Sequence, residues 1–183
     1  MLRFVLVGCA FGLAVELLYK FVGTLNPIGF FFALAFYPVY MVFVYFSAKL
    51  FDLVRSETAR LALIFFSYGL VGILFEWSVL GNSPAGNPNA SQVTMFSMWA
   101  SSAVMPKIFA DRGADLGRLH RAVRLSLLVY VLVSIAGVVL AQPVRFFWVI
   151  VLSYVFYNGL VVFYVWYLVT VRRRRVPPLR GSA

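Results

Sequence analysis

Residues 146–171 read FFWVIVLSYVFYNGLVVFYVWYLVTV and are followed directly by four arginines, Arg172, Arg173, Arg174 and Arg175. No charged residue interrupts the segment, and a helix needs about 20 apolar residues to cross the hydrocarbon core of a bilayer. Arginines directly after such a run are typical of the cytoplasmic end of a membrane-spanning helix. The segment therefore predicts a membrane span whose C-terminal end lies at the cytoplasmic surface.

The composition of the whole chain also indicates a membrane protein. Of its 183 residues, 63% are hydrophobic and 12% are charged, whereas soluble domains contain about 45–50% apolar and about 25% charged residues. A soluble enzyme and a disordered chain are therefore excluded. A disulfide scaffold is excluded as well, because Cys9 is the only cysteine.

Three further runs without charged residues cover residues 21–48, 77–106 and 125–144. The breaks between apolar runs contain Asn, Pro and Gly, which favour turns. We expect the first helix to be retained rather than cleaved as a signal peptide, because Glu16 and Lys20 interrupt its apolar run. The sequence thus predicts an all-α integral membrane protein with six transmembrane helices at about 4–22, 29–50, 61–80, 92–110, 125–142 and 147–171. These helices form one domain over residues 1–171, followed by a basic cytoplasmic tail at 172–183.

The distribution of Lys and Arg predicts the orientation. With six spans, both termini lie on one side, and 14 of the 16 basic residues lie there too, leaving only Lys20 and Arg145 on the other. Positively charged loops stay in the cytoplasm, so both termini are predicted to be cytoplasmic, in the cell (inner) membrane. The net charge of +10 is explained by this topology and predicts no nucleic-acid partner.

The basic tail also predicts a contact with lipid. Clusters of Lys and Arg directly on the cytoplasmic side of a span attract anionic lipid headgroups. The residues expected to make this contact are Arg172, Arg173, Arg174 and Arg175.

An internal duplication is visible in the first four predicted helices. The sequence GLAVE at residues 12–16 recurs as GILFE at residues 72–76. Downstream of these motifs, Tyr40 aligns with Trp99 and Asp52 aligns with Asp111. Because two-helix units repeat in the same orientation, they are predicted to be parallel repeats about an axis along the membrane normal. The units cover about 4–52 and 61–111, and a decayed third unit at 125–171 would place Gln142 opposite Glu16.

Glu16 and Glu76 are the only acidic residues inside the predicted spans. At 1.5 Å per residue, each lies roughly 20–24 Å from the cytoplasmic end of its helix, in the outer half of a core about 30 Å thick. An ionisable group that faces lipid there costs at least about 2.5 kcal/mol, so both should face the bundle interior. Gly12 and Gly72 lie on the same faces and allow close helix packing. We therefore predict one shared polar site, with Tyr40, Trp99, Asn158 and Gln142 as further candidates.

Several chemical roles are open to this pair of acids. They could carry protons, bind a cation or act as general acid and base, or each could be a neutral structural acid that is hydrogen-bonded to its surroundings. The sequence contains no metal-binding or cofactor-binding motif, so neither is predicted. His120 is the only histidine and is expected in a solvated loop before residue 125.

Gly12-x3-Glu16-x2-Tyr19, followed by Tyr37-Pro38-Val39-Tyr40, resembles the opening of the ABC-transporter permease CmpB-like family. That family is similar to the vertebrate transmembrane protein 229 group. The resemblance covers residues 12–40, and Met41 stands where the family has a glycine. It implies a multi-pass membrane protein.

The sequence favours a transporter or permease-like protein with a paired-glutamate site open toward the outside. One alternative is a membrane-embedded enzyme that acts on a lipid or isoprenoid through the same acids. Another is a non-catalytic subunit of a larger membrane complex. The expected surroundings are the lipid bilayer, with a second copy of the chain or other membrane subunits as candidate partners.

Overall fold

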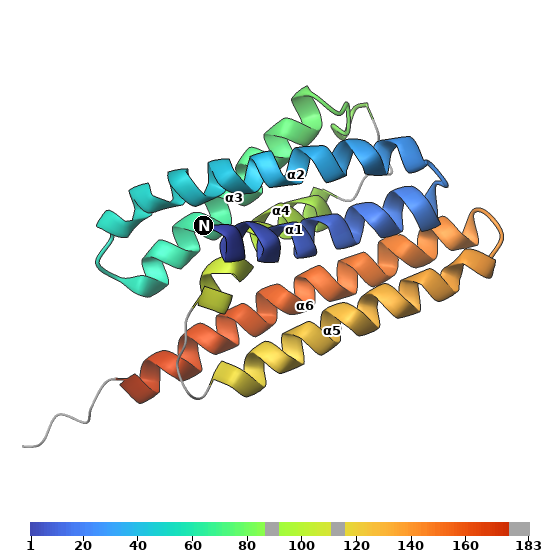
Figure 1. Ribbon diagram of the computed structural model, residues 1–183. Coiled ribbons are helices and arrows are strands. Elements are labelled where there is room, and N and C mark those ends of the chain that lie inside the picture. The colour runs from blue at the N-terminus through green and yellow to red at the C-terminus, as the bar shows by residue number, and fades with distance from the viewer. Residues whose placement is uncertain (87–91, 111–115, 176–183) are drawn as a thin grey trace, which may run out of the picture.

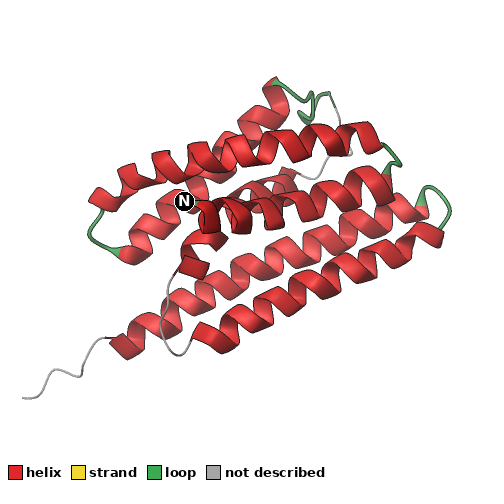
Figure 2. Cartoon of the chain, in the orientation of Figure 1, coloured by secondary structure: helices red, strands yellow, loops and turns green. Residues whose placement is uncertain are grey.

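The computed structural model describes residues 1–86, 92–110 and 116–175, and all regular structure in these ranges is helical (Figures 1 and 2). Short turns join antiparallel helices into hairpins. The described α-helices are α1 (Leu2–Glu16), α2 (Pro27–Ser47), α3 (Glu57–Ser78), α4 (Gln92–Ala110), α5 (Leu116–Ala136) and α6 (Val144–Arg175). The π-helical segment η1 (Leu17–Gly23) continues α1, while the 3-10 segments η2 (Ala48–Leu53) and η3 (Gly137–Val139) continue α2 and α5.

Five of these helical segments in the described ranges are long and apolar enough to cross a membrane, which marks the chain as a multi-pass membrane protein. They are Leu2–Gly23, Pro27–Leu53, Glu57–Ser78, His120–Val139 and Val144–Tyr164. The helix expected at 92–110 is present as α4, but it is not among the five. Its sequence contains several hydroxyl and amide side chains and Lys107, which lower its hydropathy.

Helix α4 lies inside the bundle (Figure 1). It packs against α1, α3 and α6, while α2 packs mainly on α1 and α5 on α6. All residues from 97 to 106 are buried, so the polar side chains in this part of α4 are covered by protein. Polar side chains that are covered by protein find hydrogen-bond partners there, as Ser102 does with the Met98 carbonyl at 2.9 Å.

The turn between α1 and α2 brings the C-terminal end of the first helical segment and the N-terminal end of α2 together. Leu25 has a left-handed backbone with φ of 53°, which reverses the chain. The Asn26 side chain then accepts a hydrogen bond from the Gly29 N–H at 3.2 Å, and Pro27 occupies the first helical position. This is a standard N-terminal cap, and it starts α2 two residues before the predicted position.

Several predicted helix boundaries differ from the structure, and the start of α5 differs most. Helix α5 begins at Leu116 rather than near residue 125, so the expectation that His120 lies in a loop is wrong. The His120 ring stacks on Phe109 with a centroid distance of 4.7 Å, and Nε2 lies 3.1 Å from the Ile108 carbonyl oxygen. The prediction used uncharged runs, which reveal only the apolar part of a helix. Leu, Ala and Arg all favour helix, so α5 continues beyond its uncharged part.

The last predicted helix ends four residues too early for the same reason. Helix α6 continues past residue 171 and ends at Arg175. The backbone of the four arginines is therefore helical, while the boundary between membrane domain and basic tail at residues 171 and 172 stays a prediction. The arginines that extend the helix are Arg172, Arg173, Arg174 and Arg175.

An ion-pair network lies at the end of the bundle opposite the α1–α2 turn. The Asp52 carboxylate is 3.5 Å from Arg60 and 3.6 Å from Lys107. It thereby links the α2–α3 connection to the end of α4. Asp111, which the repeat aligns with Asp52, lies outside the described residues.

Candidate functional site

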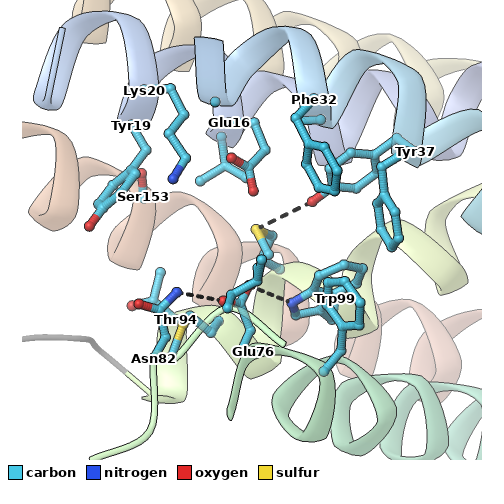
Figure 3. A pocket seen from close by; sticks show the side chains of 18 of the residues that line it. Glu16, Tyr19, Lys20, Phe32, Tyr37, Glu76, Asn82, Thr94, Trp99 and Ser153 are labelled. Atoms are coloured by element: carbon cyan, nitrogen blue, oxygen red, sulfur yellow. Dashed lines mark hydrogen bonds between the residues drawn. The ribbon is translucent and has the colours of Figure 1, made fainter. Parts of the chain in front are cut away.

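A cavity of about 390 Å³ opens near the end of the bundle where the α1–α2 turn and the α3–α4 connection lie. Both glutamates that the sequence singles out line it (Figure 3). Its polar lining residues are Glu16, Tyr19, Lys20, Asn26, Tyr37, Glu76, Asn82, Thr94 and Ser153. Its larger apolar lining residues are Ile28, Phe32, Phe36, Phe75, Leu80, Met95, Met98, Trp99 and Ile150.

Glu76 is held at both carboxylate oxygens. The indole N–H of Trp99 donates to Oε1 at 3.1 Å, and the Asn82 amide donates to Oε2 at 2.8 Å (Figure 3). Gly81 makes the second bond possible, because its φ of +71° turns the chain after α3 back over the helix end. Such a backbone favours glycine. Glu76, which is only 4% exposed, therefore has a fixed position.

Glu16 approaches the cavity from the opposite wall (Figure 3). It is the last residue of α1, and Lys20 in the following π-helical segment reaches into the same cavity. The charged residues that share the described cavity lining with Glu16 are Lys20 and Glu76. Within the described parts of the chain, no hydrogen bond or salt bridge holds the Glu16 carboxyl. The two acids thus differ: one is fixed by donors, and the other is available to a ligand.

The glycine of each Gly-x3-Glu motif packs against an aromatic ring. A Cβ at Gly12 would lie 2.0 Å from the Tyr37 ring, and a Cβ at Gly72 would lie 2.0 Å from Trp99. The two rings stack on each other with a centroid distance of 5.7 Å and an interplanar angle of 13°. These four residues form a continuous layer through α1, α2, α4 and α3. Each glycine therefore allows an aromatic ring to pack against the helix about one turn before its glutamate.

The internal repeat aligns Tyr40 with Trp99, but in the structure Tyr37 is the residue of α2 that packs against its glycine as Trp99 does. Tyr40 packs edge-on against Trp99 with a centroid distance of 4.8 Å, but it does not line the cavity. Its hydroxyl is buried and has no hydrogen-bond partner within the described residues. Of the candidates proposed beside the two acids, Trp99 is the one that the structure places in the cavity wall.

Asn158 and Gln142 lie outside the cavity lining. The Asn158 side chain accepts a hydrogen bond from Ser97 at 3.0 Å and donates to the Tyr154 carbonyl at 2.7 Å. The Gln142 amide donates to the Gly23 carbonyl. Asn158 thus links α6 to α4, and Gln142 links the turn before α6 to η1, so each satisfies polar groups where these segments meet.

Lys20 and Asn82 are cavity residues that the sequence analysis did not select. Lys20 follows Glu16 by four residues, a spacing that places both on one helix face, so it could have been found. Asn82 was expected only as a turn residue, and its contact with Glu76 depends on the backbone of Gly81.

The predicted lipid contact of the basic tail stays a prediction. The arginines lie at the end of α6, but their side chains are outside the described part of the structure. These residues are Arg172, Arg173, Arg174 and Arg175.

Comparison of the chain with protein-family models, curated proteins and solved structures finds no match. Within the described residues, no group of three or more His, Cys, Asp or Glu side chains is arranged to hold a metal ion.

Proposed function

We propose that the chain is a small transporter or permease-like protein of the cell (inner) membrane and that the Glu16–Glu76 cavity binds its ligand. One observation carries the proposal: acids from α1 and α3 line the same cavity of about 390 Å³. Pockets for small molecules occupy about 300–1,000 Å³ and combine apolar walls with a few polar groups. An ionisable residue inside a membrane protein is by default a candidate functional group.

The proposed topology has six spans, with α4 as the internal span and both termini in the cytoplasm. The positive charge near the helix ends supports this orientation. The cavity then lies toward the outer surface, because it is formed by the α1–α2 turn and the start of the α3–α4 connection. The matching glycine–ring contacts of α1–α2 and α3–α4 support a parallel repeat.

A role in enzymatic conversion of a lipid is the second candidate. It is favoured by the exposed apolar residues on the cavity rim, among them Ile28 and Phe32. A lipid substrate could reach the two acids through such a rim, and Glu16 could then transfer a proton.

An uptake experiment tests the proposal. Proteoliposomes that contain the wild-type protein, Glu16→Gln or the control Glu57→Gln are incubated with a cell metabolite extract, and retained compounds are identified by mass spectrometry. Glu57 lies in the exposed first turn of α3, outside the cavity lining. We expect at least one compound to accumulate several-fold more with the wild-type protein and Glu57→Gln than with Glu16→Gln.

Two other outcomes would contradict transport. Identical contents in all three preparations would reject the cavity as a transport site. Formation of a new compound that depends on Glu16, without accumulation, would favour the enzyme instead.

A further inference from the structure

We infer that the cavity binds an amphiphile with a cationic head group, which enters from the surrounding lipid between α2 and α3. The inference rests on the proposed function and specifies the ligand of that same site. Three features carry it: the rim of the cavity, the contact between α2 and α3, and the balance of charge inside.

The rim is apolar and faces outward. Ile28, Phe32 and Leu80 all line the cavity, yet they are 80%, 59% and 42% exposed. Ile28 and Phe32 belong to the candidate span Pro27–Leu53, so in the proposed topology their exposed side chains meet lipid. A ligand that passes this rim therefore has an apolar part, because a fully hydrated solute would lose water there without forming new hydrogen bonds.

Side chains close the wall between α2 and α3. These two helices are not among the pairs whose backbones approach closely. Phe36 of α2 stacks on Phe75 of α3 with a centroid distance of 5.0 Å, and Phe32 stacks on Phe36 at 6.1 Å. Phe32 is exposed, whereas Phe36 and Phe75 are half-buried. Rotation of these rings would open the wall while both helices stay in place.

The ionisable groups of the cavity favour a positive head group. Among the described lining residues, Glu16 and Glu76 face one base, Lys20, so one negative charge is in excess when both acids are ionised. Both oxygens of Glu76 already accept hydrogen bonds, which leaves the Glu16 carboxylate for the ligand. An anionic head group would instead be repelled by two carboxylates.

Lys20 shows how the site accommodates an ammonium group. Its Nζ lies 5.3 Å from the centroid of the Tyr19 ring, within the range of a cation–π contact. A ligand ammonium beside Glu16 would combine the Glu16 carboxylate with an aromatic ring of the cavity lining, such as Tyr19. A cavity of about 390 Å³ holds a head group and the first part of a chain, and the remaining tail lies in the bilayer.

A binding experiment tests the charge of the ligand. Wild-type protein, Glu16→Gln and Glu57→Gln are placed in phosphatidylcholine nanodiscs and titrated with decylammonium, decyl sulfate or decanol, with thermal stability as the readout. Non-specific partitioning into the bilayer is the same for all variants. A ligand that binds the native state raises its melting temperature, so differences between variants report the site.

We expect decylammonium to stabilise the wild-type protein and Glu57→Gln at concentrations at least about tenfold lower than it requires with Glu16→Gln, because a hydrogen bond to a charged group is lost. Decanol should show no difference between variants, and decyl sulfate should stabilise Glu16→Gln at least as strongly as the wild-type protein, because the Glu16 carboxylate repels it. Stabilisation of the wild-type protein by decyl sulfate or decanol that is lost in Glu16→Gln would overturn the cationic head group.

Photolabelling tests the route of entry. A decylammonium derivative with a diazirine at the tail end should label Phe32, Leu80 or neighbouring lipid-facing residues of α2 and α3. Labelling of residues 82–86 instead would place the tail outside the bilayer and reject entry from lipid.

The two proposals can fail separately. If no decyl compound distinguishes wild-type protein from Glu16→Gln while Glu16-dependent uptake persists, the ligand class is wrong and the transport proposal stands. If Glu16-dependent uptake is also absent, the transport proposal fails as well.

Discussion

Replacement of each cavity glutamate by leucine should separate their structural roles. Both Glu16→Leu and Glu76→Leu remove a carboxylate from the same cavity. Only Glu76→Leu breaks hydrogen bonds, because Trp99 and Asn82 donate to Glu76. Asn82 is half-buried and can turn its amide to water, but Trp99 is 2% exposed and its N–H loses its acceptor.

A buried donor without a partner costs about 1–3 kcal/mol. We therefore expect Glu76→Leu to be less stable than Glu16→Leu by about this amount. For a chain of this length, about 1 kcal/mol shifts the melting temperature by about 2–4 °C. Thermal unfolding of the two variants in the same nanodiscs should thus differ by about 2–12 °C, with Glu76→Leu lower.

A double-mutant cycle with Trp99→Phe tests the cause. In the Trp99→Phe background the indole N–H is already absent, so Glu76→Leu should destabilise by about 1–3 kcal/mol less than in the wild-type protein. Equal melting temperatures for Glu16→Leu and Glu76→Leu, or additive effects in the cycle, would refute the assignment of Glu76 as the acid held by Trp99.

Three further predictions concern packing, hydrogen bonding and topology. Gly72→Ala places a methyl group 2.0 Å from Trp99 and should destabilise the protein by about 1–3 kcal/mol. The control Gly159→Ala, with open space around it, should stabilise the protein by about 0.5–1 kcal/mol. Equal shifts in melting temperature for the two variants would contradict the contact between Gly72 and Trp99. Tyr157→Phe removes the hydrogen bond to the Phe11 carbonyl and should cost about 0.5–1.5 kcal/mol, whereas Tyr154→Phe, at a 48% exposed residue, should leave the melting temperature unchanged. Reporter fusions after residue 84 and at the C-terminus should be active outside the cell and in the cytoplasm, respectively; cytoplasmic activity of the first would overturn the topology.

The sequence alone was sufficient to predict the helical membrane architecture. Long uncharged segments can satisfy their backbone polar groups in lipid only as helices or closed barrels, and the segments here have helical length. The number of helices agrees with the described structure, although α4 does not reach the apolar character of a lipid-exposed span. The boundaries at residues 116 and 175 were missed because helices extend past their uncharged parts.

The sequence also singled out Glu16 and Glu76, because an acid in an apolar helix is costly and must have a reason for its position. Only the tertiary structure decided what surrounds them. Tyr37 rather than Tyr40 stacks on Trp99, since the rotation of α2 against α1 depends on which ring fits over Gly12. The positive φ of Gly81 brings Asn82 to Glu76 rather than to Glu16. Local sequence determines which residues are polar or small, whereas the packing of the helices determines which of them share a cavity.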